Sequence, residues 1–334
     1  MGEGDISRRE AILRAAVIAA GAGLAACDAA VRQGVDRAPG VGGATDKEGT
    51  LSKEKETTGQ DGGSRRMPVV FLPHGGGPWP FVEMSGVEPG MWDGLSAYLK
   101  RLKMTPPVTP RALLIVSAHW EAPTPTVMAS PRPPMLYDYS GFPPEAYRVQ
   151  WPAPGLPELA GDIQALLERA GFATSSDATR GFDHGAFVPM KLTWPEADVP
   201  ALQLSLKQGL DPAEHLRIGR ALAPLRDQGV FIVGSGMSYH NLRALMMRMR
   251  GGPSLIEPSR AFDDWLAESM ALEPDRRESR LVEWAKAPQA RACHPREEHL
   301  LPLHVIAGAG GDDAASLPYR DVVMGAHVCA IHFG

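Results

Sequence analysis

Three histidines occupy the same kind of position, directly after a short apolar run. They are His74 after Val69–Leu72, His119 after Ala112–Val116, and His240 after Val230–Val233. Ligand sites in open α/β sheets form beyond the carboxyl ends of the strands. If these runs are neighbouring parallel strands, the three imidazoles converge on one crevice. Neutral imidazoles suit a divalent metal such as iron or zinc.

The immediate surroundings of these histidines exclude two other kinds of site. Gly75, Gly76 and Gly77 follow His74, so backbone or a ligand can approach closely there. Neither glycine-rich phosphate-binding pattern is present. Ser235 lacks the G-x-S-x-G context of a hydrolase nucleophile. The pattern therefore favours a metal site over a nucleotide site or a serine nucleophile.

The other histidines divide into two groups. His184, in Gly-Phe-Asp-His-Gly, and His294, in Cys-His-Pro, stand in unusual local contexts. The remaining five have ordinary explanations and are not expected to act directly, although His299 is the least safely dismissed. Of these five, His215, His299 and His304 fall in helical patterns, and His327 and His332 in a terminal strand.

The elements that must position these residues alternate along the chain. Four apolar runs have strand length: Pro68–Leu72, Ala112–Val116, Ala201–Leu206 and Val230–Val233. Between and after them lie helical patterns at about 91–103, 156–170, 212–227, 259–287 and 297–309, the last with Glu297 and Glu298 in its first turn. This alternation predicts a single-domain α/β sandwich around a mixed, largely parallel sheet.

Composition sets limits on the partners. The 334 residues carry a formal net charge of −5, with 44% hydrophobic and 22% charged residues. There is no basic excess to indicate a nucleic-acid partner. Cys293 and Cys329 are too few for a disulfide framework and are expected to be buried, small apolar residues, although export would permit a bridge between them.

The N-terminus has the features of an export signal. Arg8 and Arg9 precede an apolar stretch, Ala15–Ala26, which is too short to span a bilayer. The paired arginines indicate the twin-arginine route. Leu-Ala-Ala-Cys27 resembles a bacterial lipobox, which implies cleavage before Cys27 and a lipid on its sulfur. We therefore expect an exported, periplasmic or cell-surface protein whose contact with the membrane is a lipid anchor.

The segment that follows is a predicted linker. Residues 27–66 are rich in small, polar and charged residues and cannot bury much apolar surface. The expected organisation is a signal peptide over 1–26, a linker over 27–66 and a globular catalytic domain over 67–334.

A series of motifs falls in one order across this globular domain. They are His74-Gly-Gly-Gly-Pro78, Ser117-Ala-His-Trp-Glu121, Tyr139-Ser-Gly-Phe-Pro143, Tyr147–Pro154, Gly181–Pro189, Pro195–Pro200, Gly219–Arg226, Gly234-Ser-Gly236, His240-Asn241, His294-Pro295 and Glu298-His-Leu-Leu-Pro302. Together they resemble the DOPA-dioxygenase type of class III extradiol ring-cleavage dioxygenase. The resemblance covers nearly all of residues 67–334.

This resemblance implies specific roles. His74, His119 and His294 resemble the metal ligands, and His240 the acid/base histidine, with a fourth-ligand role still open. His184 resembles a substrate-pocket histidine. The implied reaction uses one Fe(II) per chain and O2 to open a catechol-type ring, whereas some bacterial relatives hold Zn(II).

Several alternatives remain open from the sequence. Glu121, Glu297 and Glu298 are alternative carboxylate ligands, and a thiolate at Cys293 would change the metal. The aromatic residues Trp120, Phe142, Tyr147 and Trp151 are candidates for the pocket wall. Rival functions are a zinc-dependent hydrolase or orphan metalloprotein on the same scaffold, and a non-catalytic ligand-binding lipoprotein.

Overall fold

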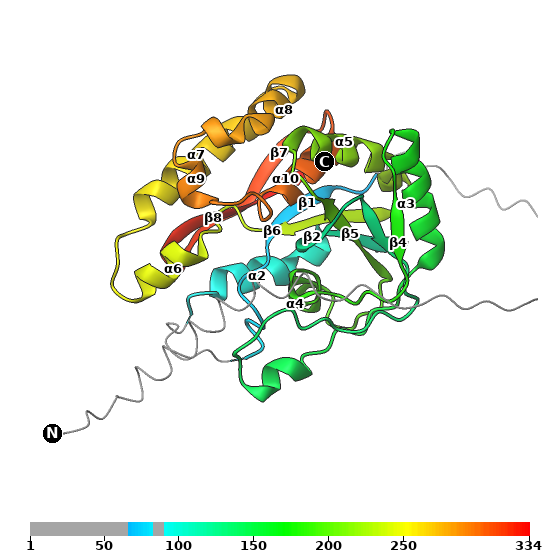
Figure 1. Ribbon diagram of the computed structural model, residues 1–334, viewed down its shortest axis with the longest axis horizontal. Coiled ribbons are helices and arrows are strands. Elements are labelled where there is room, and N and C mark those ends of the chain that lie inside the picture. The colour runs from blue at the N-terminus through cyan, green and yellow to red at the C-terminus, as the bar shows by residue number, and fades with distance from the viewer. Residues whose placement is uncertain (1–65, 83–89) are drawn as a thin grey trace, which may run out of the picture.

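The computed structural model describes residues 66–82 and 90–334, which form one eight-stranded sheet with helices on both faces (Figure 1). The strand order is β4-β3-β5-β2-β6-β1-β8-β7. The strands are β1 (Val69–Pro73), β2 (Ala112–Ala122), β3 (Thr126–Met128), β4 (Ser175–Asp177), β5 (Ala201–Lys207), β6 (Val230–Gly236), β7 (Ala315–Val323) and β8 (Ala326–Phe333). The predicted signal peptide, Cys27 and the linker up to residue 65 lie outside the described residues.

The centre of the sheet confirms the predicted parallel arrangement. Strands β2, β6 and β1 are consecutive neighbours and pair in parallel, and β5 extends the parallel set beyond β2. Strands β8 and β7 continue the sheet in antiparallel fashion beyond β1. The sheet is therefore mixed, and the three strands β1, β2 and β6, which lead to or carry His74, His119 and His240, point the same way.

The helices occupy the connections between the strands. They are α2 (Asp93–Arg101), α3 (Pro157–Arg169), α4 (His184–Thr193), α5 (Pro212–Leu222), α6 (Leu242–Met249), α7 (Ile256–Met270), α8 (Pro274–Val282), α9 (Ala290–Cys293) and α10 (Leu301–Gly310). Short 3₁₀ turns lie at Leu102–Met104, Pro144–Arg148, Ala223–Gln228 and Trp284–Lys286. Among residues 66–82 and 90–334, no helix is both long and apolar enough to cross a membrane.

Two predicted helices have different limits in the structure. The single helix expected over 259–287 is divided, because α7 ends at Met270 and Pro274 opens α8. The last helix was expected from about 297, but α10 begins at Leu301. Glu297 and Glu298 therefore lie before this helix, in the segment that leads into it.

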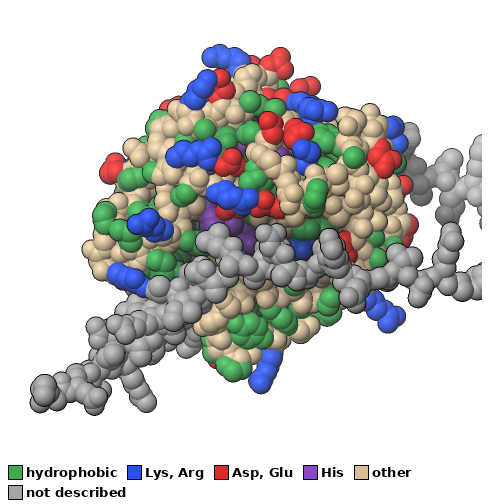
Figure 2. Space-filling view, viewed as in Figure 1, with side chains coloured by type: hydrophobic (Ala, Val, Ile, Leu, Met, Phe, Trp, Pro, Cys, Tyr) green, Lys and Arg blue, Asp and Glu red, His purple; other side chains and the backbone are tan. Residues whose placement is uncertain are grey.

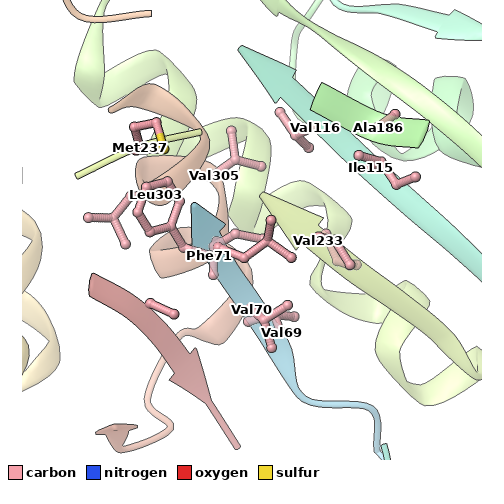
Figure 3. Close-up of a cluster of buried hydrophobic side chains, with 14 of the residues drawn as sticks. Val69, Val70, Phe71, Ile115, Val116, Ala186, Val233, Met237, Leu303 and Val305 are labelled. Atoms are coloured by element: carbon pink, nitrogen blue, oxygen red, sulfur yellow. The ribbon is translucent and has the colours of Figure 1, made fainter. Parts of the chain in front are cut away.

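Helices α10 and α4 cover opposite faces of the central strands. A side chain at Gly234 would collide with Pro302 and Ile306 of α10, whereas the next residue, Ser235, bonds to Gly185 of α4. Successive strand residues face opposite sides of a sheet, so the two helices lie on different faces. Figure 3 shows apolar side chains from β1, β2, β6 and α10 packed together in this core.

Candidate metal centre

Three imidazoles converge at the carboxyl-terminal edge of the sheet. One ring nitrogen from each of His74, His119 and His299 lies within 4.8 Å of the other two. The Nε2 atoms of His74 and His119 are 3.1 Å apart. The His299 ring centroid is 5.2 Å from that of His74 and 4.9 Å from that of His119.

The other ring nitrogen of His74 is held by a polar chain. Its Nδ1 lies 3.1 Å from Ser235 Oγ, and the Ser235 hydroxyl donates to the carbonyl of Gly185. Because that hydroxyl proton is already used, His74 Nδ1–H is the donor to Ser235. This tautomer leaves the lone pair on Nε2, directed at the group of three.

The other two rings are held by carboxylates. His299 Nδ1 lies 3.0 Å from Glu298 Oε1, and His119 Nδ1 lies 3.5 Å from Asp138 Oδ2. Carboxylates accept from the Nδ1–H groups, so the Nε2 lone pairs again face inward. Metal-binding histidines commonly have such a partner on the second nitrogen.

The burial of the group fits a bound divalent metal. His299 Nε2 is buried without a hydrogen-bond partner. Burial, strengthened by the neighbouring imidazoles, lowers the pKa of His119 to about 3 and holds the pKa of His74 and His299 well below the usual value. The rings are therefore neutral, as metal ligation requires, and a cation would satisfy the orphaned nitrogen.

Asp138 lies between His119, one of the three converging rings, and a fourth ring, that of His184. The Asp138 Oδ1 atom is 2.8 Å from His184 Nδ1 and 2.9 Å from the His184 backbone nitrogen. Burial alone favours the neutral ring, but the Asp138 charge raises the pKa of His184. The His184 and His119 ring centroids are 3.9 Å apart, so a ring whose charged form is favoured by Asp138 lies beside the candidate metal position.

Glu298 joins His299 to a fifth ring, His240. The Glu298 Oε1 atom is 3.3 Å from His240 Nδ1, and the His240 and His299 rings stack with centroids 3.3 Å apart. Arg296 lies at the outer side of this group, 3.5 Å from Glu298 and bound through two 2.6 Å contacts to Glu121. Burial opposes ionisation of Glu298, but His240 and Arg296 lower its pKa.

The structure supports the predicted convergence of His74, His119 and His240 at one edge of the sheet. One detail differs: β2 continues to Ala122, so His119 lies within the strand rather than after it. The pairing of β2 with β5 shifts register between Val116 and Glu121, which is where His119 is presented.

His294 does not lie where the sequence placed it. It was predicted as a metal ligand, but it is fully buried behind the site and its Nε2 donates to the carbonyl of Ser238, at 2.9 Å. His299, five residues later and not expected to act, supplies the third converging ring. It precedes α10 instead of lying within a helix, which frees its ring to turn toward His74.

The carboxylates also have defined partners. Glu121 pairs with Arg296 and Glu297 with Arg291, whereas Glu298 contacts two of the histidines. The two cysteines are buried and unbridged, as predicted. Burial raises the pKa of Cys293 to about 12, so it supplies no thiolate to the site.

Two residues of the predicted aromatic wall, Phe142 and Tyr147, lie on the side of His184, where they contact Tyr139. Tyr139 is 5.8 Å from His184 between ring centroids, and it packs against Phe142 and Tyr147. Trp151 is instead fully buried and donates to the carbonyl of Trp194. The wall therefore consists of Tyr139, Phe142 and Tyr147, whereas Trp151 belongs to the core. Trp120 packs under the guanidinium of Arg180.

The histidine cluster is partly open to solvent, because the side chains of His119 and His240 are 21% and 17% exposed. Figure 2 shows histidine surface next to a group of acidic and basic side chains on the face in view. The cluster thus combines three neutral imidazoles, a proton-donating ring, a further ring on a carboxylate, and an aromatic side.

A family model described as the catalytic LigB subunit of aromatic ring-opening dioxygenase matches residues 70–330. The chain belongs to this family. It is a class III extradiol ring-cleavage dioxygenase, an oxidoreductase that depends on a metal. The ordered motifs and the converging rings agree with that membership.

Several curated relatives align over much of the chain. A 4,5-DOPA dioxygenase extradiol of Portulaca grandiflora is 43% identical over 218 residues, covering 64% of this chain and 78% of the relative. The Escherichia coli K12 protein of the same name is 33% identical, covering 78% and 92%. The dioxygenase tasH of Hapsidospora irregularis is 37% identical, covering 80% and 85%.

A solved structure shares the fold. The crystal structure of an Escherichia coli K12 protein superposes with a TM-score of 0.65 at 30% identity, covering 80% of this chain and all of the other. The α/β architecture of this dioxygenase is therefore that of a solved relative.

Proposed function

We propose that His74, His119 and His299 hold one Fe(II) ion and that the substrate is a catechol. The convergence of three imidazoles, each with its second nitrogen partnered by the protein, carries this proposal. Bound Fe(II) would supply a redox-active centre that accepts both catechol oxygens and O2. The name 4,5-DOPA dioxygenase of the relatives supports a catechol, and the aromatic side formed by Tyr139, Phe142 and Tyr147 can pack against its ring.

His240 is the proposed proton acceptor. A catechol must lose protons to bind through both oxygens, and an imidazole is suited to take one near neutral pH. Because Glu298 lies 3.3 Å from His240 Nδ1, the Nδ1–H points at the carboxylate and Nε2 is the accepting atom. The same atom returns the proton when the ring opens.

His184 has the complementary proposed role. Its Nδ1–H is held by Asp138, and its raised pKa favours the form that also carries a proton on Nε2. That proton can be donated to negative charge that develops on oxygen during the reaction. The site therefore divides proton acceptance and donation between two rings, each on its own carboxylate.

Metal loading tests the function directly. Protein loaded anaerobically with Fe(II) should consume O2 when a catechol is added and form a coloured ring-opened product. The same preparation loaded with Zn(II) should consume none, because zinc cannot change its oxidation state. Turnover of an ester or amide substrate by the zinc form, without oxygen uptake by the iron form, would instead establish the hydrolase alternative.

We also propose that the enzyme is exported by the twin-arginine route and lipid-anchored at Cys27. The proposal rests on the sequence alone: Arg8 and Arg9, the apolar stretch and the lipobox-like Leu-Ala-Ala-Cys. Cys27→Ala should move the protein from the membrane fraction to the soluble fraction and abolish incorporation of labelled fatty acid. Replacing Arg8 and Arg9 by lysine should leave it inside the cell. Membrane retention of the Cys27 variant would show that the attachment lies elsewhere.

A further inference from the structure

His294 is buried at the back of the histidine cluster, and the metal centre does not use it. Its ring lies near Phe262 and Trp284, with centroid distances of 5.3 and 6.0 Å. Its ring donates from Nε2 to the carbonyl oxygen of Ser238, at 2.9 Å. Ser238 stands two residues before His240, in the loop that follows β6.

This loop is bonded along its length to the segment that carries His299. The backbone N–H of Met237 donates to the carbonyl of His299 at 3.0 Å, and that of His240 to the carbonyl of Cys293 at 3.0 Å. The side-chain amide of Asn241 donates to the carbonyl of Ala292 at 2.8 Å. The loop and the segment are therefore held together as one unit.

Within this unit, Ser238 is held from both sides. The N–H of Cys329, on β8, donates to Ser238 Oγ at 2.8 Å, while His294 bonds to its carbonyl. Among the bonds between this loop and the 292–299 segment, only that of His294 is made by a fully buried side chain of the segment. Ser238 thus couples strand β8 to the segment on which His299 lies.

The chemistry of the His294 ring indicates why a histidine stands there. Its Nδ1 is buried without a partner, which costs free energy that an aliphatic side chain would avoid. An aliphatic side chain would, however, leave the Ser238 carbonyl unpaired inside the protein. The orphaned nitrogen is therefore tolerated because the opposite nitrogen supplies a donor that the loop needs.

We propose that His294 is a positioning residue: it holds the loop of residues 237–241 so that His240 faces the metal centre, and it binds no metal itself. The proposal rests on the assignment of His240 as proton acceptor. Transfer of a proton depends steeply on donor–acceptor geometry, so a small displacement of the loop affects the chemical step more than substrate binding.

Two substitutions separate the bond from the bulk of the side chain. In iron-loaded protein, His294→Leu should keep full metal stoichiometry and a catechol KM close to wild type, while kcat falls by roughly 10- to 100-fold, the scale expected from misplacing a catalytic group by about 1 Å. His294→Gln retains an N–H donor at similar reach and should recover most of kcat.

His304 provides the matched control. It is also fully buried on α10, its Nε2 lies 3.0 Å from the carbonyl of Leu281 and its Nδ1 3.3 Å from that of Leu300, and neither contact involves the loop of residues 237–241. His304→Leu should lower the unfolding midpoint to a similar extent and leave kcat unchanged. Equal losses of kcat in His294→Leu and His304→Leu would mean that general destabilisation is the cause, and the positioning role would be rejected.

A readout independent of turnover completes the test. Hydrogen exchange of the Met237 and His240 amides should accelerate in His294→Leu and stay at the wild-type rate in His304→Leu. Unchanged exchange with wild-type kcat would overturn the proposal, as would loss of metal from folded His294→Leu. If wild-type protein consumes no O2 with any catechol, the proposed function fails, and the exchange rates alone decide whether His294 holds the loop.

Discussion

Two carboxylates in this dioxygenase each connect a ring of the metal centre to a ring outside it, but their geometry differs. Asp138 is closer to the outer ring, at 2.8 Å from His184 and 3.5 Å from His119. Glu298 is closer to the inner ring, at 3.0 Å from His299 and 3.3 Å from His240. Only Glu298 also faces an arginine, Arg296.

The difference indicates a division of labour. Asp138 accepts two hydrogen bonds from His184 and raises its pKa, so this ring is held in place and its protonated form is favoured. Glu298 shares its charge among His299, His240 and Arg296, so it holds the proposed ligand and the proposed proton acceptor side by side. A carboxylate thus supports the proposed proton donor on one side of the cluster and a proposed metal ligand on the other.

The largest expected effect distinguishes the two histidines that contact Glu298, which are His299 and His240. His299→Ala should lose most of its metal, because a directly coordinating nitrogen is removed. His240→Ala should keep the metal and lose about 100- to 10,000-fold in kcat, the range for a lost general acid–base group. Metal analysis with oxygen uptake measures both. Loss of metal from His240→Ala, restored by excess iron, would make His240 a fourth ligand.

The next effect compares the carboxylates themselves. Glu298→Gln should weaken metal affinity by about 10- to 100-fold, as is typical when the partner of a ligand is altered. Asp138→Asn should weaken it less, since its contact to His119 is longer, but should lower kcat because the His184 pKa falls. Chelator competition and kinetics at saturating metal distinguish them. The reverse ranking would contradict the division of labour.

The smallest effect concerns buried histidines that lack a carboxylate partner. Burial lowers the pKa of His304 to about 4 and that of His294 to about 3. Below pH 6.5 the unfolded chain binds protons on these rings and the folded protein does not, so the free energy of unfolding decreases as the pH is lowered. Each ring should cost about 1.6 kcal/mol between pH 6.5 and 5. Urea unfolding of His304→Leu across this range should show a shallower decline than wild type.

Much of this architecture could be predicted from local patterns. The buried apolar runs indicated β1, β2, β5 and β6, and their parallel neighbours follow from the alternation with helices. Histidines after three of the apolar runs were enough to predict convergence, because parallel strands end at one edge of the sheet. These inferences succeeded because they depend on short-range order and on a general property of α/β sheets.

The choice between His294 and His299 could not be made in the same way. Both histidines lie in one segment without regular structure, and backbone direction there depends on the bonds between the 292–299 segment and the loop after β6. The Glu298-His299 pair was a usable signal, since a carboxylate beside a histidine suits ligand support. Asp138 offered only an acid between two tyrosines, and its contacts to His119 and His184 are made across the fold.

The inward-facing donors of His74, His119 and His299 are all imidazole nitrogens, and the nearby thiol of Cys293 stays protonated. Such a set has no built-in preference for iron, because nitrogen sites bind copper and zinc more tightly than Fe(II) under the Irving–Williams order. Occupancy in the cell is therefore decided by which ion is available where the chain acquires its metal. An iron enzyme of this design must be loaded where copper and zinc are scarce, so its compartment of metallation contributes to its activity as much as its ligands do.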